Sequence, residues 1–150
     1  MESIADTNPS ISILLVEDDN TTRDLLGSII TLKFTDVALH TAGNGRTGLE
    51  LFKTHTPDIV ITDINMPEMG GVQMAGKIRA IKPDTKLIVL TGNTEKAALE
   101  HADGEGLEID HYILKPVDFR MLFAAIEKCL GELAQQEKTE GSITNRGVSP

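Results

Sequence analysis

The sequence predicts an α/β protein built on a doubly wound, five-stranded parallel sheet, a (βα)5 arrangement. Short, nearly continuous apolar runs, as expected for strands buried on both faces, alternate along the chain with segments whose apolar residues recur at helical spacing. Turn and loop residues separate the two kinds of segment. This regular alternation implies a parallel sheet with helices on both faces and right-handed crossovers.

Five segments are expected to be strands. The third carries the apolar run Ile-Val-Ile-Thr and ends at Asp63, and the fourth has Leu-Ile-Val-Leu at its centre. The second is weaker. The five segments are Ile11 to Val16, Val37 to Ala42, Ile59 to Asp63, Lys86 to Thr91 and His111 to Leu114.

Five segments are expected to be helices. Leu25 and Ile29 belong to the apolar face of the first, Pro57 ends the second, and Asp118 is expected to N-cap the last. Glycine- and acid-rich residues from Ala102 to Asp110 are expected to form a loop. The helical segments are Asn20 to Lys33, Gly45 to His55, Gly71 to Ile81, Thr94 to Ala102 and the stretch that follows Asp118.

The chain of 150 residues is expected to hold one domain. Regular patterning covers residues 11–133, which we predict to be the folded domain. Residues 1–10 are predicted to be a flexible N-terminus. From about Ala134 the pattern dissolves into polar residues and glycine, so residues 134–150 are predicted to be a flexible C-terminal tail.

Composition narrows the classes of function. The formal net charge of −9 argues against direct nucleic-acid binding, which needs a basic footprint. No apolar run approaches the roughly 20 residues that span a membrane, and no secretory signal is evident. Cys129 is the single cysteine and is expected to be a small buried hydrophobe, which fits a cytoplasmic setting. His40, His55 and His101 lack metal-ligand spacing and are expected to be surface residues.

Acidic residues follow two of the expected strands. Asp63 ends the third strand, and Glu17, Asp18 and Asp19 follow the first. Ligands of open α/β sheets bind at the carboxyl ends of the strands, and the first and third strands can be neighbours in such a sheet. The carboxylates would then converge and raise one another's pKa values, a conflict that a divalent cation resolves. Hard oxygen ligands favour Mg²⁺ or Mn²⁺.

Two further strand ends supply the other groups that phosphoryl chemistry needs. Lys115 can act as a point charge and Thr91 as a hydroxyl donor. Asp63 would then be the nucleophile that forms an aspartyl-phosphate. Pro116 follows Lys115, and an X-Pro bond can be cis, which would aim the lysine. Each residue alone has an ordinary structural interpretation, but their common place at one sheet edge favours the functional one.

Four motifs between Ser12 and Leu130 resemble the receiver domains of two-component response regulators, in order and with family-like spacing. They are Ile-Leu-Leu-Val-Glu-Asp-Asp ending at Asp19, Asp63 with Met66-Pro67, Leu90-Thr91-Gly92 and Tyr112-Ile113-Leu114-Lys115-Pro116. The resemblance implies the strand order 2-1-3-4-5. It also implies a signalling domain rather than an enzyme, one that assists its own aspartyl phosphorylation and dephosphorylation.

The resemblance implies a role for each residue at this edge. Asp63 would accept a phosphoryl group from the phosphohistidine of a histidine kinase. Asp18, Asp63 and the backbone carbonyl of Asn65 would bind Mg²⁺ or Mn²⁺ directly, and Glu17 would act through a water. The backbone amides of Asn65 and Gly92 would hold the phosphoryl oxygens.

The resemblance also implies a conformational response. Thr91 would move toward the phosphate and Tyr112 would rotate inward, which would remodel the face formed by the fourth helix, the fifth strand and the fifth helix. The implied partners are a sensor histidine kinase or phosphotransfer protein and a downstream protein. The residues leave open the kinase, the output, the phosphate lifetime, dimerisation through this face, and whether the chain is a stand-alone receiver or part of a larger regulator.

Three other interpretations fit the residues less well. A Gly-x-Gly-x-x-Gly pattern from Gly43 matches a dinucleotide fingerprint, but that motif should follow the first strand of its unit. A phosphatase of the haloacid dehalogenase type needs a second acid two residues after its nucleophile, where this chain has Asn65. A non-phosphorylated interaction module on the same fold would not account for Asp63, Thr91 and Lys115.

Overall fold

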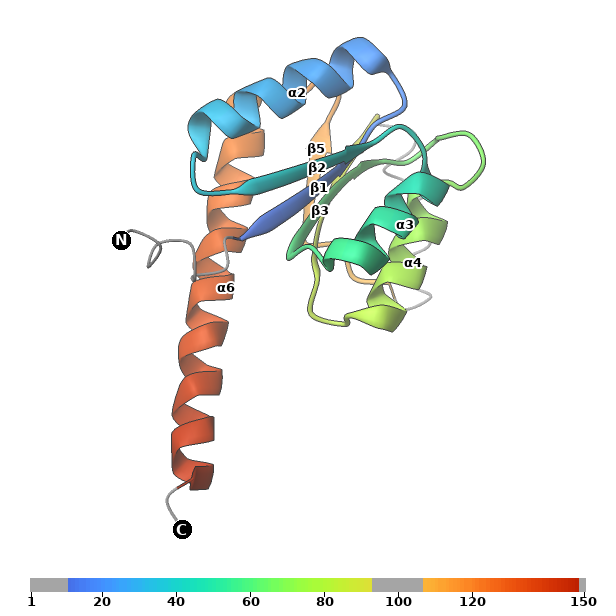
Figure 1. Ribbon diagram of the computed structural model, residues 1–150. Helices are drawn as coiled ribbons and strands as arrows, with labels where there is room; N and C mark the ends of the chain where they lie inside the picture. The colour runs from blue at the N-terminus through green and yellow to red at the C-terminus, as the bar shows by residue number, and fades with distance from the viewer. Residues whose placement is uncertain (1–10, 93–106, 149–150) are drawn as a thin grey trace, which may run out of the picture.

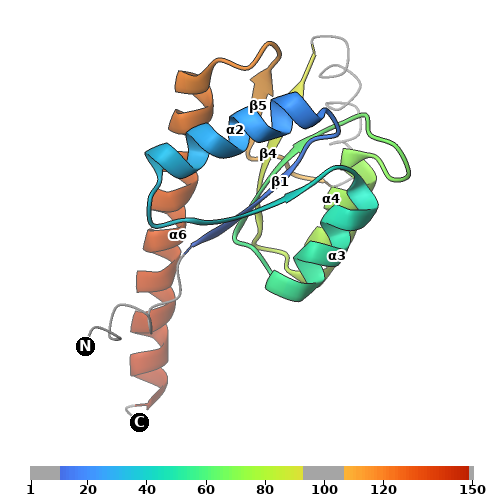
Figure 2. The same cartoon turned by 45° about the horizontal axis from the view of Figure 1, so that its top comes forward.

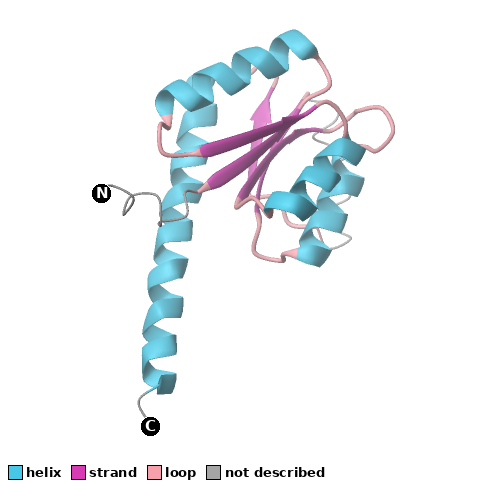
Figure 3. Cartoon of the chain, viewed as in Figure 1, coloured by secondary structure: helices cyan, strands magenta, loops and turns pink. Residues whose placement is uncertain are grey.

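The computed structural model describes residues 11–92 and 107–148, with side chains up to residue 136. Its five strands form one parallel sheet in the order β2-β1-β3-β4-β5, which confirms the predicted fold class and strand order (Figure 3). The described elements are β1 (Ser12–Val16), α2 (Asn20–Lys33), β2 (Ala38–Ala42), α3 (Gly45–His55), β3 (Ile59–Asp63), α4 (Gly71–Ile81), β4 (Lys86–Thr91), β5 (His111–Leu114) and α6 (Phe119–Val148).

Helices cover both faces of the sheet. Figures 1 and 2 show α2 and α6 on one face and α3 and α4 on the other. The first face buries Leu15 and Ile61, and the second buries Leu14 and Val60. Successive residues of a strand point to opposite faces, so central strands covered on both sides need apolar residues at every position. Cys129 is fully buried in the first core, as predicted, and burial raises the pKa of its thiol to about 12.

Side-chain caps fix where the helices leave the sheet edge. Asp19 caps α2 by accepting hydrogen bonds from the backbone nitrogen of Thr22 at 2.8 Å and from its hydroxyl at 2.7 Å. The Asn44 side chain caps α3. Asp118 caps α6, as predicted, and accepts from the backbone nitrogen of Arg120 at 2.9 Å. Each cap satisfies an N–H group that has no partner within its helix.

The register of the sheet aligns the ends of four strands. Glu17 directly follows Val16, the last paired residue of β1. Asp63 and Thr91 are the last paired residues of β3 and β4, and Lys115 follows the last paired residue of β5. The four candidate site residues therefore leave the sheet at the same edge.

Most predicted element bounds agree with the structure to within one residue. β1 begins at Ser12 rather than Ile11, and β2 begins at Ala38 rather than Val37. The helix predicted over residues 94–102 and most of the loop predicted over residues 102–110 lie outside the described residues. None of the helices described combines the length and apolar character that crossing a membrane requires.

Helix α6 runs further than the sequence pattern predicts. The pattern predicts that regular structure ends near Ala134, but α6 continues to Val148 and its C-terminal part projects beyond the sheet (Figure 1). The residues from Ala134 read Ala-Gln-Gln-Glu-Lys, which are good helix formers, and no proline follows before Pro150. The apolar periodicity fades here because the helix leaves the sheet, not because the helix ends.

Candidate functional site

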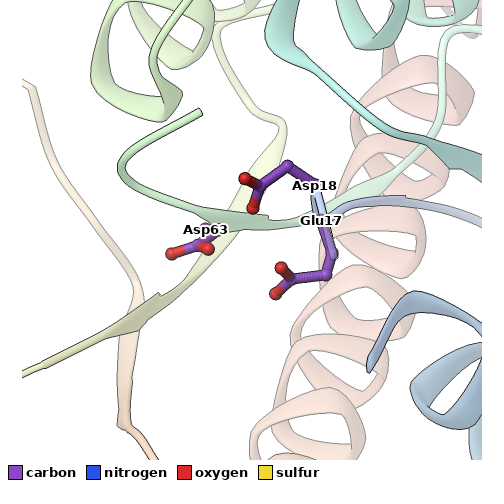
Figure 4. Close-up of side chains that lie close together, drawn as sticks. All are labelled: Glu17, Asp18 and Asp63. Carbon is purple, nitrogen blue, oxygen red and sulfur yellow. The ribbon is translucent and has the colours of Figure 1, made fainter. Parts of the chain in front are cut away.

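Three carboxylates meet at the ends of β1 and β3. Glu17 and Asp18 follow β1, Asp63 ends β3, and one carboxylate oxygen from each lies within 4.8 Å of the others. Figure 4 shows the three side chains gathered at this edge. They meet because β1 and β3 are neighbours in the sheet. Negative charges this close disfavour one another's ionised forms unless a cation compensates them.

Asp63 is held in place from two sides. Its side chain is almost fully buried. One carboxylate oxygen, Oδ1, accepts a hydrogen bond from the backbone nitrogen of Ile64 at 2.8 Å. The other, Oδ2, accepts from Lys115 Nζ at 2.7 Å, a charge-assisted bond that sets the orientation of the carboxylate. A Cβ atom at position 71 would overlap the Asp63 carbonyl, so Gly71 allows α4 to begin against the end of β3.

Glu17 is the most enclosed member of the cluster, with 2% of its surface exposed. Its Oε2 accepts a hydrogen bond from the backbone nitrogen of Asp19 at 3.1 Å. Its Oε1 has no hydrogen-bond partner among the described residues and lies 3.9 Å from Lys115 Nζ. Burial raises the pKa of the Glu17 carboxyl and the charge of Asp63 adds to this, although the Asp19 amide and Lys115 act in the opposite direction.

This donor set fits Mg²⁺ or Mn²⁺. All three side chains offer oxygen atoms, which hard divalent cations prefer. The Glu17 Oε1 atom is an independent indication, because a buried polar atom without a hydrogen bond from the described part of the chain needs another partner, such as an ion or a water. A divalent cation at this edge would also offset the repulsion between the carboxylates.

Lys115 connects the end of β5 to the cluster, and Thr91 lies at the end of β4, between β3 and β5 in the sheet. Thr91 is fully buried, and its hydroxyl donates to the carbonyl of Gly92 at 3.0 Å. The backbone nitrogen of Lys115 donates to the Thr91 carbonyl at 2.8 Å. The peptide bond between Lys115 and Pro116 is cis, as predicted. The lysine side chain extends from this point to Asp63, across the end of β4.

Asn65 and Tyr112, the two remaining predicted residues of the site and switch, are less enclosed. Asn65 is exposed in the loop between β3 and α4. Tyr112 is half-buried on β5, where it pairs in register with Val89. Its neighbour Ile113 belongs to the core under α2 and α6, so by alternation Tyr112 faces the opposite side of the sheet.

Two arrangements are not evident from the sequence. Arg23, in the first turn of α2, donates from Nη1 to the backbone carbonyl of Glu17 at 2.8 Å. The only signal in the sequence is its position one helical turn after the acidic run. His40 and His55 stack with ring centroids 3.9 Å apart and planes inclined by 13°. His55 is exposed, as predicted, but His40 is half-buried, and burial lowers its pKa, with a smaller contribution from His55.

The chain is similar to proteins of one family. Residues 13–127 match the model of the response regulator receiver domain. The chain is 32% identical over 126 residues to the uncharacterized transcriptional regulatory protein YesN of Bacillus subtilis (strain 168), a match that covers 83% of this chain and 34% of YesN. It is 34% identical over 116 residues to the probable C4-dicarboxylate response regulator DctR of the same organism, with 77% of this chain and 50% of DctR covered. The chain thus spans half or less of these relatives.

Solved structures are similar over nearly their whole length. The N-terminal domain of an uncharacterized protein from Wolinella succinogenes superposes with a TM-score of 0.74 at 33% identity, covering 84% of this chain and 99% of that one. A response regulator receiver domain protein from Clostridium thermocellum superposes with a TM-score of 0.75 at 27% identity, covering 83% of this chain and 98% of that one.

Proposed function

Because this chain belongs to the response regulator receiver family, whose members are phosphoacceptor signalling domains, we propose that Asp63 accepts a phosphoryl group from the phosphohistidine of a sensor histidine kinase or a phosphotransfer protein. The observation that carries the proposal is the 2.7 Å bond between Lys115 Nζ and Asp63 Oδ2, beside two further carboxylates within 4.8 Å. Receiver domains interact with histidine kinases and with downstream effectors.

The proposed transfer is an attack by a carboxylate oxygen of Asp63 on phosphorus. A P–O bond forms while the P–N bond to the imidazole breaks, and the leaving nitrogen keeps the electron pair and takes up a proton. Lys115 balances the negative charge of the carboxylate before transfer and of the phosphoryl oxygens after it. The same groups would assist hydrolysis of the aspartyl-phosphate by water, so the domain would also limit the lifetime of its own signal.

A divalent cation, Mg²⁺ or Mn²⁺, would neutralise charge on the phosphoryl oxygens when bound. Asp18, Asp63 and the backbone carbonyl of Asn65 would hold it, and Glu17 would act through a water. The backbone amides of Asn65 and Gly92 would donate to the phosphoryl oxygens. The oxygen donors, the spacing of the carboxylates and the Glu17 oxygen without a hydrogen bond in the described chain support this assignment.

Phosphorylation would act as a switch because it adds about −1.5 to −2 charge beside Thr91. The Thr91 hydroxyl, which donates to the Gly92 carbonyl at 3.0 Å, would exchange this acceptor for a charged phosphoryl oxygen, which is a stronger one. Its movement would free space for Tyr112 to turn inward. The face that includes β5 and α6 would then change shape, and a downstream protein or a second copy of the chain would bind the changed face.

Incubation with Mg²⁺ and a small-molecule phosphodonor, followed by intact-protein mass, tests the proposal. The wild-type protein should gain one phosphoryl group, and the gain should disappear with EDTA and in Asp63→Asn. Asp36→Asn is a matched control, because Asp36 is an exposed carboxylate in the turn before β2 and should leave labelling unchanged. No gain in the wild type, or a gain that persists in Asp63→Asn, would exclude Asp63 as the acceptor.

A further inference from the structure

Arg23 lies beside the acidic edge without touching any of its three clustered carboxylates. Its Nη1 donates to the backbone carbonyl of Glu17 at 2.8 Å, and its Nη2 donates to the side-chain oxygen of Asn20 at 2.6 Å. The side chain is half-buried. The guanidinium group therefore bridges the end of β1 and the first residue of α2.

The Glu17 carbonyl, which Arg23 binds, lies at the point where the chain leaves the sheet. The backbone nitrogen of Glu17 makes the last contact of β1 with β2, donating to the Ala42 carbonyl at 3.0 Å. Beyond it the chain leaves the sheet, and a buried carbonyl there needs a donor from elsewhere. Arg23 is that donor. The same peptide group joins Glu17 to Asp18, so its orientation determines where the Asp18 side chain begins.

Gly43 makes room for the guanidinium. A Cβ atom at this position would lie 3.1 Å from Arg23 Nη1, closer than an ordinary van der Waals contact. The backbone of Gly43 is outside the left-handed region, so conformational freedom is not what a glycine provides here. The two hydrogen-bond acceptors hold Arg23 in one orientation, and the absence of a side chain at Gly43 leaves room for Nη1 in that orientation.

We propose that Arg23 is a positioning residue for the divalent cation site, acting through the peptide group between Glu17 and Asp18. This inference rests on the proposed function, because it presumes that Asp18 and Asp63 hold the cation. Two effects of Arg23 oppose each other. Its positive charge, which helps to lower the pKa of Asp19 behind the hydrogen bonds from Thr22, repels a cation. Its hydrogen bond to the Glu17 carbonyl keeps the ligands in place, and this effect dominates.

The two effects would change the affinity for a divalent cation in opposite directions, so the affinity of Arg23 variants tests the proposal. Mn²⁺ binding, followed by loss of the free-ion paramagnetic resonance signal, should be about 10- to 100-fold weaker in Arg23→Gln, as is typical when a group that orients metal ligands is removed. Arg23→Lys should recover part of this affinity, because an ammonium can replace one of the two hydrogen bonds but not both. Arg120→Gln is the matched control, since Arg120 is 91% exposed and pairs with Asp118. It should bind Mn²⁺ like the wild type.

A second variant disturbs the position of the guanidinium and keeps its charge. Gly43→Ala introduces the 3.1 Å contact with Nη1 and should weaken Mn²⁺ binding in the same direction as Arg23→Gln. Thermal unfolding in EDTA identifies a temperature at which every variant is folded, and the Mn²⁺ affinities are compared at that temperature. Unchanged or tighter binding in folded Arg23→Gln would overturn the positioning role and leave the proposed function intact. Absence of Mn²⁺ and Mg²⁺ binding in the wild type would overturn both.

Discussion

Replacing Glu17 by glutamine should stabilise the metal-free protein at neutral pH while weakening its cation site. Burial raises the pKa of the Glu17 carboxyl above its ordinary value of 4.5. The folded protein therefore binds a proton at the Glu17 carboxyl more tightly than the unfolded chain does. Stability is highest below the unfolded pKa and is lost as the pH rises through the folded pKa, and the loss persists at neutral pH. A glutamine carries no charge and avoids this loss.

The size of the gain in stability depends on which interactions of the Glu17 carboxylate are not cancelled by others. At an effective dielectric constant of about 20, Lys115 Nζ at 3.9 Å attracts the carboxylate by about 4 kcal/mol, and a carboxylate within 4.8 Å repels it by a similar amount. Solvent weakens the attraction further, since Lys115 is 37% exposed. The cost of burying Oε1 without a hydrogen bond then decides, at about 1–3 kcal/mol. We expect a gain of about 1 kcal/mol, because glutamine can still accept from the Asp19 amide but its own amide needs partners.

Urea and thermal unfolding measure this gain. In EDTA at about pH 7.5, Glu17→Gln should melt roughly 2–4 °C above the wild type, the shift typical of 1 kcal/mol in a protein of this size. The difference should shrink as the pH falls below 4.5, because the wild-type carboxyl is then increasingly protonated in both the folded and the unfolded state. Saturating Mg²⁺ should reverse the order, because the wild type binds it more tightly. A Glu17→Gln protein less stable than the wild type in EDTA at neutral pH would refute the reasoning.

Three other predictions concern the phosphoacceptor, the histidine pair and a close helix contact. Lys115→Met should slow phosphodonor labelling about 100-fold, because it removes the cation 2.7 Å from the acceptor; an unchanged time course of intact mass would contradict this. Stability to urea should fall as the pH drops from 6.5 through the lowered pKa of His40, and His55→Asn should reduce that fall. Gly45→Ala should cost about 1–3 kcal/mol of unfolding free energy, because its Cβ would overlap a loop carbonyl. Gly76→Ala, with open space around it in α4, should instead gain about 0.5–1 kcal/mol, and equal effects of the two would contradict the packing.

The central strands were predictable because burial on both faces favours apolar residues at nearly every position. β3 and β4 have the bounds that the sequence predicts, since each apolar run ends where the chain reaches the sheet edge. Asp63 was recognisable for the same reason, as the first carboxylate after a run that tolerates none. The order of the strands has no such local signal. It came from the resemblance of four motifs, and the structure confirms it.

Contacts between distant parts of the chain were harder to predict. His40 and His55 stack only because α3 packs against β2, and no periodicity in either segment indicates this. The bond between Arg23 and the Glu17 carbonyl depends on a backbone atom, which the identity of residue 17 does not reveal. The end of α6 was placed too early because apolar periodicity records contact with the sheet, whereas helix propensity continues beyond it.

Glu17 brings the stability and the function of this edge together in one residue. Its carbonyl is satisfied by Arg23 and its amide by Ala42, so the backbone is fixed where the strand ends. Of its carboxylate oxygens, Oε2 accepts from Asp19, whereas Oε1 is buried without a hydrogen bond from the described chain. A protein optimised for stability alone would provide a hydrogen-bond donor for Oε1 or would have no oxygen atom at this position. The buried Oε1 atom beside Asp63 is explained if this edge of the sheet binds a cation. Cation binding would then offset the free-energy cost of burying this oxygen, which the metal-free fold bears.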